Sequence, residues 1–211
     1  MKLPLILALT AVFSFAQLSG QKIDLPKPNL DKGYSIMKSL SLRKSAAAQD
    51  FGKAKDLSLM ELSELLWAAN GINRPNEEKR TAPSAMNAQD IDIYVLAKNG
   101  AYLYNAKNNS LNLVTNSDLR AMAAGSQEAF AAAPIILLLV SDVSKFPRGD
   151  DATRQKMGMF DAGIVSQNIS LYCSGTGLIT RVRMFMDSEG LAKALKLPAT
   201  QIPMLNHPTG K

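Results

Sequence analysis

The residue types that usually perform acid–base or metal chemistry are scarce in this sequence. It contains a single histidine, His207, and a single cysteine, Cys173. A tetrahedral zinc site needs four such ligands, and a thiol nucleophile needs a neighbouring base. We therefore expect no metal centre and no Cys-His pair within one chain. We interpret Cys173 as a small buried hydrophobic residue and His207 as a structural residue, and we identify no catalytic side chain.

Two short glycine motifs resemble nucleotide-binding sequences but lack their defining parts. The motif at 175–177 has no third glycine and follows a helical pattern, so it is not a dinucleotide fingerprint. The motif at 208–211 lacks the first glycine and the following helix of a phosphate loop. What remains is binding chemistry, in which a cofactor supplies the reactivity and the protein holds it. A non-catalytic binding module would have the same residue content.

One long helix is the main element available to position a cofactor. Residues 157–177 are apolar on most sides of a helix, so this helix must be buried on several faces. The small residues along it are Ala162, Gly163, Ser166, Ser170 and Ser174. Small side chains let another helix or a flat ligand approach closely. The helix has more apolar surface than one small domain can cover, so we predict a homodimer.

The remaining elements mix helices and strands without strict βαβ alternation. Helices are predicted at 34–42, 59–69 and 188–195, with a helical stretch at 118–133 that is interrupted at Gly125. Strands are predicted at 91–96, 101–104, 111–114, 134–140, 178–186 and 202–205, with 134–140 as the central strand. Residues 74–89 are predicted as a polar loop. This order predicts an α+β protein with an antiparallel-rich mixed sheet flanked by helices.

The N-terminus has the pattern of a secretory signal peptide. A lysine precedes an unbroken apolar run within residues 1–16, and the run ends at a small-x-small site. The alternative is a buried N-terminal helix. We expect cleavage near Gln17, export to a periplasm, an extended segment over residues 17–32, and one domain over 33–211.

The charge pattern argues against a nucleic-acid partner. The formal net charge is +6, but the cations are scattered and aromatic residues make up only 6% of the chain. A nucleic-acid surface would need clustered cations and stacking rings. We interpret the charge as a solvated basic surface, with which a local phosphate site remains compatible.

Several segments in the same order resemble the nitroreductase-like FMN flavoproteins. They are residues 57–71, 80–85, 93–95, 101–104, 125–127, 133–134 and 161–178. The similarity is greatest to the azoline-oxidising dehydrogenases of modified-peptide biosynthesis. It implies a nitroreductase-like fold whose long helix forms the core of a homodimer. It also implies bound FMN and ping-pong hydride transfer through flavin N5 between a small-molecule electron donor and acceptor.

The resemblance also assigns cofactor-binding positions. These are Arg43, Lys44, Ser45, Pro83, Ser84, Ala85, Asn87, Gln127, Leu178, Ile179, Thr180, Gly210 and Lys211. Residues 43–45 match the phosphate-side motif, and a guanidinium fork and a hydroxyl beside a helix end suit a phosphate dianion. Residues 83–87 match a loop that reaches across the dimer to the flavin, although an ordinary Pro-Ser turn has the same sequence. Positions 127 and 178–180 match segments near the ring, and 210–211 match the strand that returns towards the phosphate.

Three positions depart from the family pattern. Ala47 stands where a second basic residue is usual, Ile179 replaces a glycine, and Met157 replaces the tyrosine of a Lys-Tyr pair in the azoline-oxidising enzymes. Two functions follow from the sequence. The first is an exported FMN-dependent oxidoreductase of unknown substrate. The alternative is a relative that has lost the flavin and serves as a binding or interaction module.

Overall fold

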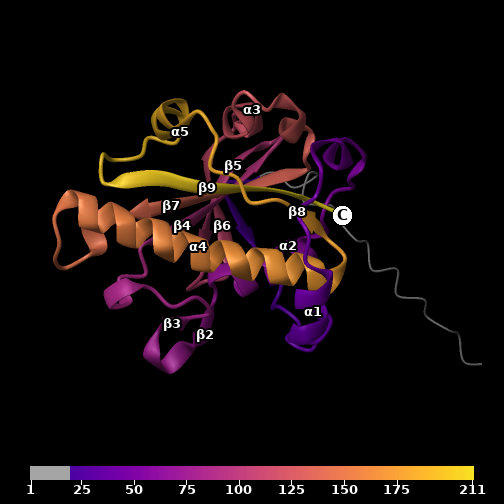
Figure 1. Cartoon of the computed structure of the whole chain (residues 1–211), viewed down its shortest axis with the longest axis horizontal. Coiled ribbons are helices and arrows are strands. Elements are labelled where there is room, and N and C mark those ends of the chain that lie inside the picture. Colours follow the sequence, from indigo (N-terminus) through magenta and orange to yellow (C-terminus); the bar gives the residue numbers. More distant parts are fainter. Residues whose placement is uncertain (1–19) are drawn as a thin grey trace, which may run out of the picture.

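A seven-stranded sheet forms the centre of the molecule (Figure 1). The computed structural model describes residues 20–211, so the predicted signal peptide and its cleavage site lie outside the described residues. The strand order is β1-β6-β5-β4-β7-β9-β8, and every neighbouring pair is antiparallel. The strands are β1 (Lys22–Asp24), β4 (Ile91–Ala97), β5 (Gly100–Asn105), β6 (Ser110–Thr115), β7 (Ile135–Asp142), β8 (Ile179–Thr180) and β9 (Gln201–Gly210). The predicted α+β class is confirmed.

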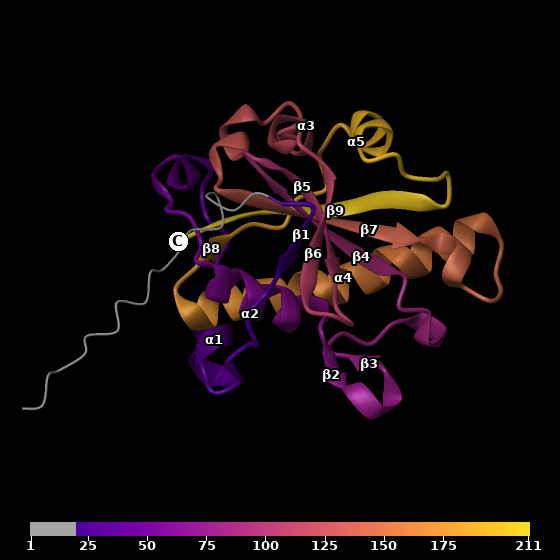
Figure 2. The ribbon, with the colours of Figure 1, turned by 180° about the vertical axis from the view of Figure 1, so that it is seen from behind.

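Helices cover both faces of this sheet (Figures 1 and 2). One face carries α1 (Ile36–Leu42), α2 (Leu59–Asn70) and α4 (Asp151–Thr176). The opposite face carries α3 (Arg120–Ala124), α5 (Ser188–Ala194) and the 3₁₀ helices η2 (Ala48–Lys53) and η5 (Glu128–Ala132). Three further 3₁₀ turns are η3 (Pro75–Glu77), η4 (Ala85–Asn87) and η6 (Val143–Lys145). Within residues 20–211, no helix combines the length and apolar composition needed to cross a bilayer.

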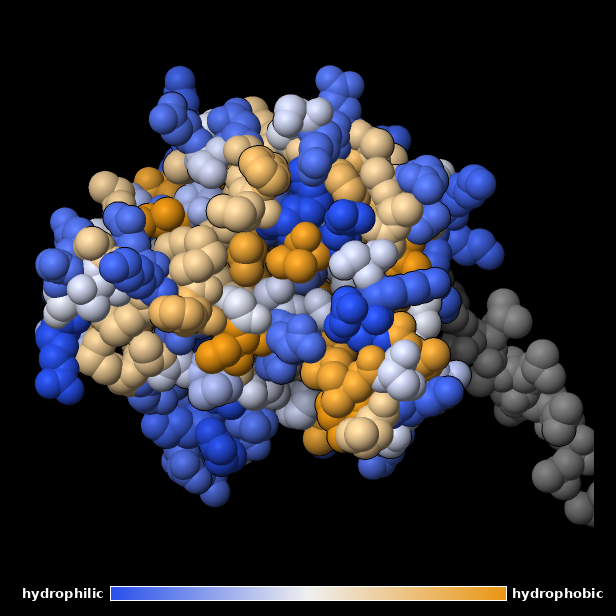
Figure 3. Space-filling model, viewed as in Figure 1, coloured by the Kyte–Doolittle hydropathy of each residue, from blue (hydrophilic) through white to orange (hydrophobic). Residues whose placement is uncertain are grey.

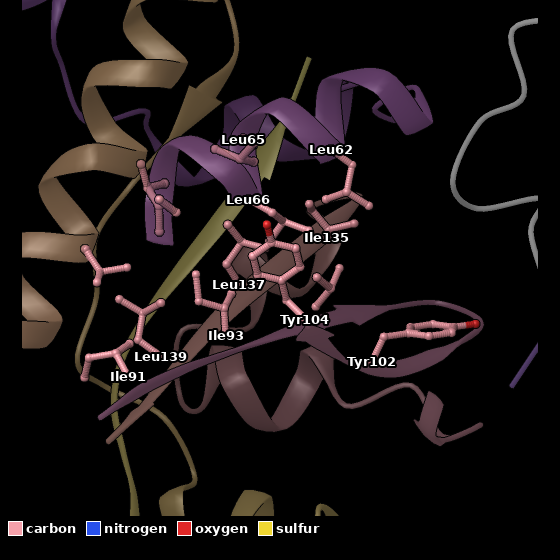
Figure 4. Close-up of a cluster of buried hydrophobic side chains, with 14 of the residues drawn as sticks. Leu62, Leu65, Leu66, Ile91, Ile93, Tyr102, Tyr104, Ile135, Leu137 and Leu139 are labelled. Atoms are coloured by element: carbon pink, nitrogen blue, oxygen red, sulfur yellow. The ribbon is translucent and has the colours of Figure 1, made fainter. Parts of the chain in front are cut away.

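Each face of the sheet has its own hydrophobic core because successive strand residues point to opposite sides. Ile93 and Leu137 face α2 and α4, whereas Leu96 and Leu138 face α3 and α5. Figure 4 shows the first core, in which leucines of α2 point towards residues of β4 and β7. The interior strand β7 is buried along its apolar length, as its continuous hydrophobic sequence predicts.

Local capping signals explain where the two main helices begin. The Ser58 side chain caps the backbone of Glu61, whose carboxylate accepts from the Ser58 N–H at 2.9 Å, and this capping box starts α2. Helix α4 begins earlier than the predicted residue 157, because the Asp150 carboxylate accepts from the Thr153 N–H at 2.8 Å. It ends at Gly177, whose φ of +79° is the left-handed conformation that favours glycine.

The C-terminal strands differ most from the sequence prediction. The strand predicted at 178–186 is much shorter than predicted: β8 has only two residues, and beyond it Arg183 makes an isolated bridge to Asn206. The strand predicted at 202–205 extends instead over the ten residues of β9. Pro203 and Pro208 interrupt its apolar pattern, and Pro203 is tolerated beside a register irregularity in the β7–β9 ladder.

Two other segments are more structured than predicted, and a third matches its prediction. The extended segment at 17–32 includes the edge strand β1, which buries Ile23 against β6. The polar loop at 74–89 includes η3, η4 and part of a small hairpin made by β2 (Ile72–Arg74) and β3 (Lys79–Arg80). The helical stretch at 118–133 divides into α3 and η5 at Gly125, whose φ is +57°, as the predicted interruption there indicates.

Candidate functional site

A groove of about 610 Å³ lies between the chain that follows α1 and the C-terminal half of α4. Its lining residues are Leu42, Lys44, Ser45, Ala46, Ala47, Asp50, Ser170, Cys173, Ser174, Gly177, Leu178, Ile179 and Thr180. Small-molecule pockets commonly have volumes of roughly 300–1,000 Å³. The groove therefore has the size of a cofactor site and is lined by segments far apart in the sequence.

Close packing between α1 and α4 forms one end of this groove. A Cβ on Gly175 would lie 2.6 Å from the Ser39 Oγ, so glycine permits the approach of the two helices. The Ser174 hydroxyl donates to the Ser39 carbonyl at 2.9 Å and fixes the contact. Some of the small residues on α4 therefore serve packing within one chain.

The segment after α1 forms the outer wall of the groove. The Ala46 N–H donates to the Thr180 carbonyl at 3.0 Å, and the Arg181 Nη1 donates to the Ala46 carbonyl at 3.1 Å. The Asp50 carboxylate accepts from the Ala47 N–H at 2.8 Å. These bonds fix the backbone of residues 46–47 and leave the side chains of Lys44 and Ser45 exposed at the groove.

The structure brings together part of the predicted cofactor site. Lys44, Ser45, Leu178, Ile179 and Thr180 all line the groove. Arg43 directly precedes them as the C-cap of α1 and is exposed. The side chains from the segment at 43–45 and from the turn after α4 therefore meet in one place.

A buried hydrogen-bond network supports the inner wall of the groove. The His207 imidazole lies between the Ser166 Oγ, 2.8 Å from Nε2, and the Thr180 Oγ1, 3.1 Å from Nδ1. Burial lowers the pKa of His207 to about 3, so the ring is neutral. Burial also raises the pKa of the Cys173 thiol well above its usual range, which removes it as a nucleophile. His207 is structural, as predicted.

The predicted phosphate-side strand residues lie at the end of β9. The Lys211 N–H donates to the Lys55 carbonyl at 3.0 Å, and the Lys211 Nζ forms an ion pair with Glu61 at 2.6 Å. A Cβ on Gly210 would lie 2.6 Å from the Ala54 Cβ. Neither predicted residue lines the groove, and the Lys211 ammonium already has a carboxylate partner.

Gln127 does not line the groove either. Its Oε1 accepts from Nε and Nη2 of Arg183 at 3.1 and 2.9 Å. Arg183 is buried and stacks over the Phe130 ring, with its Cζ 4.4 Å from the ring centroid. Gln127 therefore accepts hydrogen bonds from a buried guanidinium. The sequence alone does not indicate this role, because its partner Arg183 is 56 positions away.

The predicted loop residues Pro83, Ser84, Ala85 and Asn87 lie beside the middle of α4, apart from the groove of their own chain. The Asp161 carboxylate on α4 accepts from the Ala85 N–H with both oxygens, at 3.0 and 2.9 Å. Asp161 was part of the helix motif but was not predicted as a site residue.

An apolar face extends over α1 and α4 (Figure 3). Its exposed side chains are Ile36, Met37, Leu40 and Leu42 on α1, Met159, Phe160 and Ile164 on α4, and Met86 on the η4 loop, which we define as residues 82–90. Phe160 is 74% exposed and Met37 is 72% exposed. Gly163 is also on this face, whereas Ser166 turns inward to His207.

Comparisons with known proteins agree on the family. A model of the nitroreductase family matches residues 43–211. A protein of Methanocaldococcus jannaschii assigned as a nitroreductase is 31% identical over 167 residues, which cover 74% of this chain and 81% of that protein. A crystal structure assigned as a nitroreductase from Ralstonia eutropha has a TM-score of 0.81 at 33% identity, over 91% of this chain and 90% of that chain.

The Escherichia coli microcin synthetase complex McbBCD with truncated pro-MccB17 also contains a similar chain. Its TM-score is 0.68 at 19% identity, over 100% of this chain and 84% of that chain. At this identity the likeness shows the fold alone. The antiparallel sheet flanked by helices, with the long helix α4, defines an α+β fold of the nitroreductase type. The chain belongs to the nitroreductase family.

Proposed function

We propose that this protein is an FMN-dependent oxidoreductase that binds its cofactor in the groove between residues 42–50 and α4. The observation that carries the proposal is the meeting of Lys44 and Ser45 with residues 178–180 around one cavity of about 610 Å³. Proteins of the nitroreductase family generally bind FMN. When bound, FMN supplies hydride transfer, and the protein supplies binding and orientation.

The residues present fit the chemistry of this cofactor. Lys44 and the neighbouring Arg43 are cations beside the Ser45 hydroxyl, which suits a phosphate. The one carboxylate in the groove lining, Asp50, is bonded to the Ala47 N–H and caps η2. The Cys173 and Leu178 side chains give the inner part of the groove an apolar surface, which suits a flat ring system.

We also propose that the apolar face over α1 and α4 is the interface of a homodimer. Large apolar side chains gathered on one exposed face mark interaction sites. In such a dimer, the η4 loop of each subunit, with Met86 and Asn87 exposed at its tip, would be free to reach the groove of the partner. The predicted loop residues would then contribute to the cofactor site across the interface.

The absorption spectrum of the purified protein tests the proposed cofactor. Flavin bands at about 370 and 450 nm are expected, either at once or after addition of FMN. A colourless protein that also fails to bind added FMN would contradict the proposal.

The alternative is a flavin-less binding module, and one observation favours it. The Ile179 side chain lines the groove at a position where the family resemblance implies glycine. This alternative requires side chains such as Ile179 or Met184 to fill the pocket. Met184 is 62% exposed and is not among the lining residues, so the volume of the groove supports the cofactor proposal.

The proposed location is outside the cytoplasm, on the basis of the apolar sequence at 1–16. N-terminal sequencing of the protein from fractionated cells tests it. A mature chain that begins near Gln17 in the exported fraction is expected, whereas an intact Met1 in the cytoplasmic fraction would contradict the proposal.

A further inference from the structure

The η4 loop has an unusual backbone conformation. Met86, Asn87 and Gln89 have φ values of +53°, +55° and +48°. These values lie in the left-handed region, which residues other than glycine rarely adopt. Such residues persist only where the surrounding structure enforces them, and they often mark functional segments. The contacts that enforce this loop are therefore informative.

Asp161 on α4 provides the strongest of these contacts. Both oxygens of its carboxylate accept from the Ala85 N–H, at 3.0 and 2.9 Å, and the side chain is buried. A hydrogen bond to a charged acceptor is roughly twice as strong as a neutral one. Within the loop, the Gln89 N–H donates to the Ser84 Oγ at 2.8 Å. Asp161 thus connects the loop to the helix that carries the proposed interface.

A second buried carboxyl group, Asp90, lies beside Asp161 in the same small cavity. Its Oδ2 accepts from the Ser141 hydroxyl at 2.5 Å, and its Oδ1 has no hydrogen-bond partner. Among the described residues, neither carboxylate forms an ion pair. Burial, and then the neighbouring Asp161, raise the pKa of Asp90 to about 7. The Asp90 carboxyl therefore gains and loses its proton near neutral pH, beside Asp161.

Other charged groups lie near this pair, in a second layer around it. They are Arg80, Asp92, Asp142 and Lys145. Arg80 donates to the Asn70 carbonyl and Lys145 to the Gln89 carbonyl, at 2.9 and 3.4 Å, so both cations are directed to backbone groups near Asp90. Burial and the neighbouring Asp161 are thus the main causes that raise the pKa of Asp90.

We propose that Asp161 is a positioning residue, which holds the η4 loop in the conformation that reaches the partner's cofactor groove, and that the protonated Asp90 carboxyl keeps Asp161 in place. The reach of the loop to the partner's groove rests on the proposed function; the roles of Asp161 and Asp90 in holding the loop do not. When Asp90 loses its proton, two like charges face each other in a buried cavity. Their repulsion weakens the bond from Asp161 to Ala85 and loosens the loop.

Hydrogen exchange of the full-length protein at pH 6 and pH 8, corrected for intrinsic rates, tests this proposal. For wild type, protection of peptide 82–90 is expected to be about tenfold lower at pH 8 than at pH 6. Asp90→Asn cannot ionise and should show equal protection at both pH values. In Asp161→Ala, protection of this peptide should fall by about tenfold or more at both pH values. Asp151→Asn, an exposed carboxylate on the same helix, should behave like wild type.

The peptide from β7 at 135–142 reports on global folding. If protection of this β7 peptide falls in Asp161→Ala, the variant is globally destabilised. Asp161→Asn is then used in place of Asp161→Ala, because the Asn amide retains a neutral acceptor. Selective loss at 82–90 supports the proposal. It is overturned if neither Asp161 variant loses protection selectively, or if wild type and Asp90→Asn have the same pH profile.

Titration with FMN and riboflavin separates this inference from the proposed function. Asp161→Ala should weaken both ligands about tenfold, because the loop is proposed to contact the ring. If wild type binds FMN and Asp161→Ala binds it equally well, the inference fails and the cofactor assignment stands. If wild type binds no FMN, the proposed function and the loop's reach to the groove fail, and hydrogen exchange still decides whether Asp161 holds the loop.

Discussion

The Nε2 of His207 lies 2.8 Å from the Ser166 Oγ, which joins the sheet directly to the long helix. The same ring meets the Thr180 Oγ1 on β8 at 3.1 Å, so one neutral imidazole connects β9, β8 and α4. Thr180 lines the groove, and its position therefore depends on His207.

This network predicts a loss of stability in mild acid. The pKa of His207 is about 3 in the folded protein, below the unfolded value, so unfolded chains bind more protons between pH 3 and about 6.5. From pH 7 to pH 5, wild type should lose about 2 kcal/mol relative to His207→Gln. Urea denaturation of both proteins at both pH values measures this difference. Asp90 contributes to the free energy of unfolding with the opposite sign, because its stabilising contribution falls as the pH rises to about 7. The quantity to compare is therefore the difference in unfolding free energy between wild type and His207→Gln at each pH.

The contact between α1 and α4 predicts a compensating pair of substitutions. Gly175→Ala should destabilise the protein by about 1–3 kcal/mol, because the new Cβ meets the Ser39 Oγ at 2.6 Å. Ser39→Ala removes that oxygen and should rescue the variant. Thermal unfolding of both single variants and the double variant is the measurement. Equal costs of Gly175→Ala with and without Ser39 would refute the close contact.

The exposed face of α4 predicts the oligomeric state. Wild type should be a dimer at micromolar concentration, and Phe160→Asp with Ile164→Arg should be monomeric, because charges would enter an apolar interface. Met122→Arg, on the opposite face of the sheet, is the matched control and should remain dimeric. Light scattering after gel filtration measures the mass. A monomeric wild type, or a dimeric double variant, is the outcome that this model does not permit.

The missing family cation predicts a gain in affinity. Ala47 lines the groove, and Ala47→Lys should tighten FMN about tenfold while riboflavin changes less, since riboflavin has no phosphate. Fluorescence titration of both ligands measures the ratio. An equal gain for both ligands would place the new cation at the ring instead.

Elements with strong local signals could be predicted from the sequence. In the sequence, Ser58 with Glu61 three residues later is a capping box and Asn99-Gly100 is a hairpin turn signal, and these short-range signals locate α2 and the β4–β5 hairpin. The short length of β8 could not be predicted locally, since beyond it only the Arg183 backbone bridges Asn206, while the Arg183 side chain bonds the distant Gln127. The length of β9 was hidden by Pro203 and Pro208, whose place depends on the neighbouring strand.

The sequence motifs at 43–45 and 178–180 each lie in one segment, and residues 44–45 and 178–180 do line one groove, while their binding of FMN stays a prediction. The role of Gln127 could not be predicted, because its partner Arg183 is distant in the sequence. Asp161 was missed for the same reason: its bond to Ala85 spans 76 positions. The small residues of α4 also divide between roles that spacing cannot separate, since Ser166 faces His207 and Gly163 faces outward.

The central claim is that residues 43–45 hold the phosphate of FMN in the groove beside α4. Its most direct test is a fluorescence titration of FMN and riboflavin against wild type, Arg43→Ala/Ser45→Ala and the exposed control Arg74→Ala. The double variant should lose about 2–4 kcal/mol, or about 30- to 1,000-fold, in FMN affinity. Its riboflavin affinity and both affinities of the control should be unchanged. Equal weakening of both ligands, or of neither, would contradict the claim.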